Sequence, residues 1–234
     1  MKKTNTATIL IFLLAVPATL ILGSKMPGRW YYLTSTLIII ELLIPFFLKF
    51  EGRKPQAREL VVIAVMCALA VAARVAIPIP NFKAIYAIVM ITGIAFGSES
   101  GFLVGAVSAL SSNFFLSQGP YTPWQMMAYG AGGMLAGFLF RQGRLPRKPV
   151  LMGIVGFLGV LLFVGPLLDT CTVFIAPISM NLSSILAIYI SGFAVNISQG
   201  LSTFLVLFLL GNPMLEKLDR IKVKYGMMEG EDGI

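Results

Sequence analysis

The chain has 234 residues, of which 57% are hydrophobic and 12% are charged, and its formal net charge is +8. It contains no histidine and two cysteines, Cys67 and Cys171, neither of which has a CxxC partner. Metal sites and histidine-based catalysis therefore lack support, and each cysteine is most simply a small apolar residue in a helix. No GxxxxGK[ST] pattern occurs, so we expect no ATP hydrolysis by this chain, no catalytic residue, no metal and no cofactor.

Repeated apolar runs of about 17 residues or more are each long enough to cross the hydrocarbon core of a membrane. The strands of a transmembrane barrel alternate apolar and polar residues, and runs such as LVLFLL do not, which argues against a barrel. We therefore predict an all-α polytopic membrane protein. The eight predicted spans cover residues 7–23, 31–48, 59–77, 83–97, 100–116, 123–140, 150–169 and 184–210.

The basic residues are distributed unevenly between the two sides of the predicted membrane. If the N-terminus is cytoplasmic, 14 of the 18 Lys and Arg residues lie on the cytoplasmic side. This asymmetry predicts a multi-pass cell-membrane protein with both termini in the cytoplasm, and it explains the net charge without a nucleic-acid partner. The first span has an alternative interpretation as a cleaved secretory signal, because Lys2 and Lys3 precede its apolar stretch.

The charged segment EGRKPQAREL, residues 51–60, separates the first two spans from the other six. It predicts two N-terminal transmembrane helices in residues 1–50, a cytoplasmic linker at 51–58, a six-helix core at 59–212 and a basic cytoplasmic tail at 213–234. Within the second span, Glu41 is an acid among apolar neighbours, and a buried carboxyl should be protonated unless it is paired.

The third span carries small side chains on one helical face, because Ala64, Ala68, Ala72 and Ala76 recur every four residues. Such a face allows close approach of another helix, either within the bundle or from a separate subunit. The same spacing recurs in GFLVG, at residues 101–105, and in GMLAG, at residues 133–137, where we expect packing within the bundle.

The segment RVAIPIPNFK follows at the predicted outer side. Arg74 lies just inside the end of the third span, and Pro78 and Pro80 stop the helix. Asn81 and Lys83 lie at the mouth of the next span. Two cations near one opening suit a ligand with a phosphate or carboxylate group, or they reach lipid headgroups.

The next outer turn, SQGPYTPWQMM at residues 117–127, is polar, aromatic and rich in proline. Gly119, Pro120 and Pro123 predict a short turn, and Pro123 can begin the following helix. The aromatic residues fit either an interfacial belt or the wall of a ligand pocket, and we favour the pocket. The candidate pocket residues of this turn are Gln118, Tyr121, Thr122, Trp124 and Gln125.

Four further polar residues lie within or at the ends of spans. Asn113, Asn196 and Gln199 need hydrogen-bonding partners there, so they either link helices or line the pocket. Asp169, at the outer end of the seventh span, could pair with one of the two outer cations or contact the ligand. In the tail, EKLDRIKVKYG places apolar residues at helical spacing among cations, which predicts either a helix on the cytoplasmic membrane surface or a solvated helix end.

Residues 55–226 resemble the substrate-binding S component of an energy-coupling factor (ECF) vitamin transporter. The resemblance rests on AVMCALAVAARVAI, GIAFGSESGFLVGAVSALSSNFF, GPYTPWQM and GNPMLEKLDRIKVKYG. It implies a six-helix domain that binds a vitamin-like molecule in the outer half of the membrane. It also implies docking through Ala64, Ala68 and Ala72 onto a transmembrane coupling subunit driven by two ATPase subunits.

Among S components, the GPYTPWQM and terminal segments look most like the cobalamin type, which suggests a corrinoid ligand. The resemblance also implies that the S component topples in the membrane to release its cargo inside. The first two spans are additional to the six-helix pattern, which raises the question of how freely the bundle could reorient. An alternative function is a stand-alone proton-coupled carrier that uses Glu41 and Asp169. A membrane enzyme ranks below both, because no combination of nucleophile, base and metal is visible.

Overall fold

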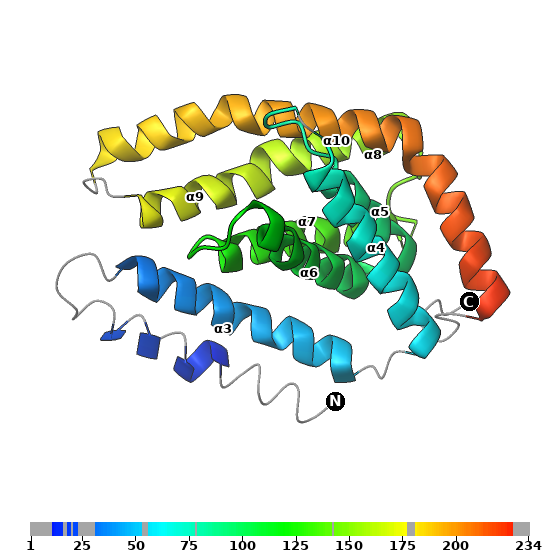
Figure 1. The fold of residues 1–234 in the computed structure, drawn as a ribbon, viewed down its shortest axis with the longest axis horizontal. Helices are drawn as coiled ribbons and strands as arrows, with labels where there is room; N and C mark the ends of the chain where they lie inside the picture. The colour runs from blue at the N-terminus through cyan, green and yellow to red at the C-terminus, as the bar shows by residue number, and fades with distance from the viewer. Residues whose placement is uncertain are drawn as a thin grey trace.

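The computed structural model describes residues 11–15, 18, 19, 21, 22, 31–52, 56–77, 79–141, 143–176 and 181–226. Within these ranges the regular elements are all helices, which confirms the predicted all-α class (Figure 1). They are η1 (Ile11–Ala15), α3 (Tyr31–Gly52), α4 (Ala57–Val75), α5 (Ile85–Phe96), α6 (Ser98–Leu116), α7 (Thr122–Phe140), α8 (Pro149–Gly159), η2 (Val160–Val164), α9 (Gly165–Ile175) and α10 (Leu182–Tyr225).

Each predicted span from the second to the eighth coincides with a helix, and α8, η2 and α9 run on as one. Among the described residues, two helical stretches have the length and apolar composition to cross a membrane, Pro149–Ile175 and Leu182–Tyr225. The first predicted span lies mostly outside the described residues, so eight spans are not confirmed.

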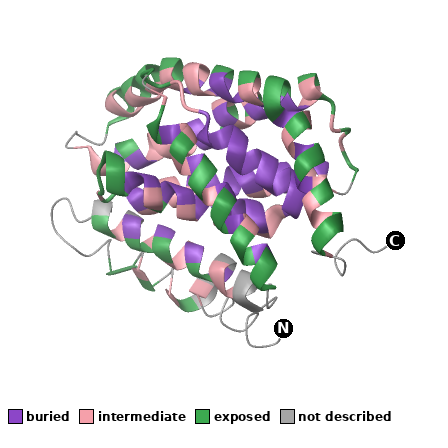
Figure 2. Ribbon diagram, turned by 45° about the vertical axis from the view of Figure 1, so that its right-hand side comes forward, coloured by how far each residue is buried: buried purple, intermediate pink, exposed green. Residues whose placement is uncertain are grey.

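The centre of the bundle is α5, whose 12 residues are all buried. It contacts α4, α6, α7 and α10, and Figure 2 shows the buried residues gathered at the middle of the molecule. A helix that is apolar on every side suits this position. Gly97, with a φ of 95°, connects α5 to α6 in a single residue, and a Cβ there would collide with the guanidinium of Arg141.

The predicted packing of these small residues within the bundle is confirmed, and it occurs between α6 and α7. A Cβ placed on Gly133 would lie 2.7 Å from the backbone carbon of Gly101, and one placed on Gly101 would lie 2.8 Å from that of Gly133. Because neither residue has a side chain, the two backbones can approach closely, and van der Waals contact replaces the hydrophobic drive that lipid does not supply.

Three cations cap the buried C-terminal end of α5. The backbone carbonyls of residues 94–96 accept hydrogen bonds from Arg147, Lys222 and Arg141 at 3.2, 3.0 and 3.0 Å, in that order. The last carbonyls of a helix have no partner within the helix, and they carry the negative end of its dipole. Basic side chains from the residue after α7, from the connection before α8 and from α10 therefore satisfy this end of the central helix.

The C-terminal segment differs from the predicted surface helix. It continues α10 without a break, and Leu215 and Leu218 are buried in the core. Asp219 forms an ion pair with Arg147 at 3.1 Å, and Lys222 reaches α5. Leu218 and Ile221 therefore pack on the protein, whereas Val223 and Tyr225 are exposed, and the last part of α10 bends and runs along one side of the bundle (Figure 1).

We expect Lys222→Met to lower the free energy of unfolding by about 1–3 kcal/mol, because it leaves a buried carbonyl of α5 without its charged donor. Lys217→Met is the matched control, since Lys217 lies on the same helix and is exposed. Chemical unfolding in detergent, followed by circular dichroism, measures both. Equal stability of the two variants would contradict the capping role of Lys222.

Candidate functional site

The guanidinium of Arg74 is the centre of a buried polar network. Arg74 lies in the last turn of α4 and is 9% exposed. It donates hydrogen bonds to Ser112 Oγ at 2.5 Å, Asn113 Oδ1 at 2.9 Å and Gln125 Oε1 at 3.3 Å. The ring of Tyr129 lies 5.3 Å from the cation. No carboxylate of the described residues forms an ion pair with Arg74, so neutral oxygens and an aromatic face surround its charge.

The network continues into the turn between α6 and α7. Asn113 Nδ2 donates to Gln125 Oε1 at 2.8 Å and to Thr122 Oγ1 at 3.0 Å. The Thr122 hydroxyl in turn donates to Gln118 Oε1 at 2.9 Å. Five of the candidate residues therefore form one connected set: Arg74 lies at its buried end, and the other four lie between residues 113 and 125.

The turn itself has the predicted form. The helix α6 ends at Leu116, α7 begins at Thr122, and Pro123 occupies the first turn of α7. The Tyr121 hydroxyl donates to the carbonyl of Ser117 at 2.9 Å, which closes the turn. Ser117 has a φ of 146°, so the chain reverses through a backbone conformation that non-glycine residues rarely adopt.

A cavity of about 380 Å³ lies beside this turn. Its volume is within the range of small-molecule sites, roughly 300–1,000 Å³. Tyr121 and Gln125 form one wall, and α9 supplies the other through Leu168, Cys171, Thr172, Ile175 and Ala176. Gln125 belongs both to the cavity wall and to the Arg74 network. A molecule that binds in the cavity and moves the Gln125 side chain would therefore alter a hydrogen bond of Arg74.

Trp124 lies behind this wall and is not among the residues that line the cavity. It is 5% exposed and stacks on Phe174 of α9, with ring centroids 5.8 Å apart. It packs in a hydrophobic cluster with Ile39 and Leu43 of α3. Its indole Nε1 is buried and has no hydrogen-bond partner among the described residues.

Asp169 and Asn196 form a separate pair between α9 and α10. Asn196 Nδ2 donates to Asp169 Oδ2 at 2.8 Å. Of the two alternatives for Asp169, pairing with an outer cation is not found among the described residues, where the amide of Asn196 is its partner. The side-chain oxygen of Gln199, one turn further along α10, is buried without a partner among the described residues.

Lys83 and Asn81 stand apart from the network. Lys83 Nζ donates to the carbonyl of Ile77, and its own carbonyl accepts from Ser202 Oγ, so Lys83 ties the loop before α5 to α10. Asn81 is exposed and has a φ of 57°, which places it at a turn. Pro78 lies outside the described residues.

Glu41 makes its contact with the N-terminal segment. Thr19 Oγ1 donates to Glu41 Oε1 at 2.6 Å, while the other carboxyl oxygen is buried without a partner among the described residues. Glu41 and Asp169 therefore have different neutral partners, from different elements. No described contact links them into a proton path, and the carrier hypothesis gains no support.

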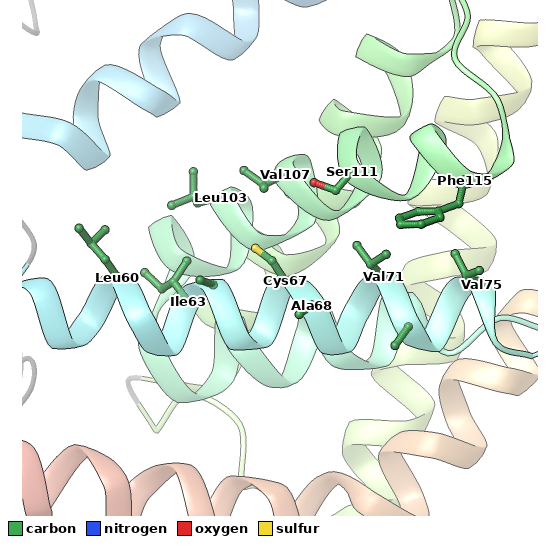
Figure 3. Close-up of a pocket in the computed structure, with 12 residues that line it drawn as sticks. Leu60, Ile63, Cys67, Ala68, Val71, Val75, Leu103, Val107, Ser111 and Phe115 are labelled. Carbon is green, nitrogen blue, oxygen red and sulfur yellow. The ribbon is translucent and has the colours of Figure 1, made fainter.

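A second, apolar concavity of about 680 Å³ lies between α4 and α6. Figure 3 shows side chains of both helices facing one another across it. Ala64, Ala68 and Ala72 line it and are exposed, so this small-residue face is not covered by another helix of the described bundle. We call this surface the alanine groove. Its other lining residues are Leu60, Ile63, Cys67, Val71, Val75, Leu103, Val107, Ser111 and Phe115.

Several neighbours of the site are not evident from sequence patterns. Ser112 and Tyr129 complete the surroundings of Arg74, while Cys171 and Thr172 line the cavity. The SSN triplet and the spacing of four between Gln125 and Tyr129 are signals for the first two. For α9, the sequence offers no signal that distinguishes the cavity side of the helix from its other faces.

Residues 54–216 match the family described as the ECF-type riboflavin transporter, S component. No curated protein and no solved structure matches the chain. The predicted S-component resemblance is confirmed, whereas the cobalamin type is not, because the matching family is the riboflavin type. S components are membrane-embedded, bind a small molecule and work with the transmembrane and ATPase modules of ECF transporters. This chain belongs to the ECF-type riboflavin transporter S-component family and is a transporter subunit, not an enzyme.

Proposed function

We propose that this chain captures a vitamin from outside the cell in the cavity between α7 and α9, and presents it to partner subunits for ATP-driven import. One observation carries the proposal. A buried cation, held by neutral groups, is connected through Gln125 to a cavity of about 380 Å³. Burying a charge is costly, so proteins usually retain such an arrangement where it recognises a ligand or supports a mechanism.

The proposed orientation places the cavity outside and both termini in the cytoplasm. Arg141, Arg147 and Lys222 meet at the C-terminal end of α5. Arg74, in the last turn of α4, and Gln125, in the first turn of α7, meet at the opposite end of the bundle. An accumulation of basic residues at one end is typical of the cytoplasmic side.

The proposed domain organisation keeps the predicted bounds. Residues 59–212 form the substrate-binding domain, and residues 1–50 form two helices in addition to it. Residues 51–58 are a linker, and residues 213–234 are a basic tail.

The cavity volume favours a molecule of flavin size over a corrinoid, whose ring and amide arms are far larger. The name of the matching family also refers to riboflavin. A corrinoid remains the second candidate, because the amides of Asn113, Gln118 and Gln125 lie together at this end of the bundle. Arg74, which Gln125 connects to the cavity, would favour a substrate with an anionic group, such as a phosphate ester.

Mass spectrometry of small molecules retained on the gently purified protein tests the proposed function. We expect a single vitamin at near-stoichiometric amount, released on denaturation, with riboflavin or its phosphate as the first candidate and a corrinoid as the second. Equilibrium binding of riboflavin, its phosphate and cyanocobalamin to the emptied protein then ranks them. Uptake by the chain alone that collapses with the proton gradient would contradict the proposal.

We expect Gln125→Leu to weaken vitamin binding by about tenfold or more, because the variant removes the amide that joins the cavity to Arg74, and such bonds to charged groups contribute about 1.5–3 kcal/mol. Gln56→Leu is the matched control, since Gln56 is exposed and makes no capping bond. Titration of the purified variants measures affinity, and copurification measures assembly. Normal affinity in Gln125→Leu would remove this residue from the site.

We further propose that the alanine groove receives helices of the transmembrane coupling subunit. The groove is open, almost wholly apolar and formed by small side chains on α4. In lipid, helices associate where small residues allow their backbones to approach, so an uncovered small-residue face favours a partner helix. Its position on α4 and α6 leaves the cavity on α7 and α9 free.

We expect Ala68→Leu to reduce copurification with the coupling and ATPase subunits severalfold while vitamin affinity changes little, because the larger side chain fills the alanine groove. Ala194→Leu, at an exposed position of α10, controls for the substitution itself. Equal recovery of the complex with both variants would show that the coupling subunit binds elsewhere.

A further inference from the structure

The helix α3 lies outside the residues that match the family, yet it packs against the part of the bundle that holds the cavity. The family match begins at residue 54, whereas α3 ends at Gly52. It contacts α6, α7 and α9, and Figure 1 shows it running alongside the bundle. Ile39 and Leu43 are 6% and 5% exposed, which is as buried as core residues of the bundle itself.

The buried side of α3 forms a second layer behind the cavity wall. Ile39 and Leu43 share a hydrophobic cluster with Trp124 and Cys171. Tyr121 and Ile175 pack against the same cluster, and like Cys171 they line the cavity. The order from lipid to cavity is therefore α3, then the cluster around Trp124, then the cavity wall.

A hydrogen bond also fixes α3 to the turn that carries the wall. Thr36 Oγ1 donates to the carbonyl of Pro120 at 3.2 Å. Pro120 immediately precedes Tyr121, and the turn here includes Ser117 in its unusual backbone conformation. This contact gives α3 a polar attachment to the turn in addition to its apolar packing.

The remaining surface of α3 is apolar and exposed at Leu37, Ile40 and Ile44. Each of these residues directly follows a buried one, Thr36, Ile39 or Leu43, so the exposed apolar side chains lie on a neighbouring face of the helix, and that face suits lipid. Among the described residues of α3, none lines the alanine groove. The helix thus packs behind the cavity wall and leaves the alanine groove, the proposed docking surface, uncovered.

We infer that α3 is a positioning element of the substrate site, which holds Tyr121 and Trp124 in place from behind the cavity wall. The substrate side of this inference rests on the proposed function. The additional helix is then a part of the binding unit, and Leu43 and Thr36 act on the vitamin through residues that they position.

The test uses the full chain with Trp30→Phe, which leaves Trp124 as the one tryptophan. Leu43→Ala is compared with Ile44→Ala, since Leu43 is buried and its neighbour Ile44 is 41% exposed. Thr36→Val is compared with Thr36→Ser, which retains the hydroxyl donor. Three quantities are measured: acrylamide quenching of Trp124 fluorescence, affinity for riboflavin and for cyanocobalamin, and copurification with the coupling and ATPase subunits.

We expect Leu43→Ala and Thr36→Val to raise the quenching constant of Trp124 by about twofold and to weaken binding of the vitamin probe by about fivefold, as loss of packing behind the wall requires. Ile44→Ala and Thr36→Ser should resemble the parent, and all four should assemble normally. Rescue by serine separates a positioning role from general loss of folding. Valine has nearly the volume of threonine, so Thr36→Val removes the hydroxyl without creating a cavity. It therefore still tests whether α3 positions the cavity wall if Leu43→Ala does not fold.

Equal vitamin affinity in Leu43→Ala and Ile44→Ala would overturn the inference, as would unchanged quenching of Trp124 in both Leu43→Ala and Thr36→Val. If the parent protein binds neither probe, the proposed vitamin specificity fails instead, and the quenching comparison still decides whether α3 holds the wall.

Discussion

A guanidinium that is removed from water has to find oxygen atoms inside the protein, and much of the arrangement at one end of this bundle follows from that requirement. Arg74 brings α4 to α6 and α7, because its acceptors are Ser112, Asn113 and Gln125. These acceptors are neutral, so the charge is solvated without being cancelled. The same side chains extend to the turn before α7, which shapes one wall of the cavity.

At the opposite end of the bundle, the groups that need partners are acceptors and the side chains that supply the donors are cations. Here the unsatisfied groups are the carbonyls of α5, and the cations come from three separate parts of the chain. Between these ends, glycines at the contact of α6 and α7 remove side chains from the interface and allow close packing. The result is a closely packed middle, with a polar network at one end and a capped helix terminus at the other. The alanine groove lies along its side.

The sequence predicted the helices well, since long apolar runs bounded by charge, proline or glycine leave few alternatives in a membrane. It also indicated three of the network residues as candidates: Asn113 as an amide within an apolar span that needs a partner, Arg74 as a cation near the outer opening, and Gln125 as part of the polar outer turn. It did not predict which partner each would take. Asp169 pairs with Asn196, and Trp124 faces α3, because these choices depend on how helices distant in sequence rotate against one another. The end of α10 was predicted as a helix, but its amphipathic spacing did not indicate that Leu218 would pack on the bundle, because such spacing does not distinguish a lipid surface from a neighbouring helix.

The single-residue corner at Gly97 has a consequence for how this sequence can vary. A Cβ at residue 97 would occupy the space of the Arg141 guanidinium, which donates to the carbonyl of Phe96 at 3.0 Å. The backbone φ of 95° disfavours other residues independently of that collision. Positions 97 and 141 are therefore linked: a larger residue at the corner displaces the arginine that caps the preceding helix. A substitution at position 97 therefore also requires a change at position 141, even though 44 positions separate the two along the chain.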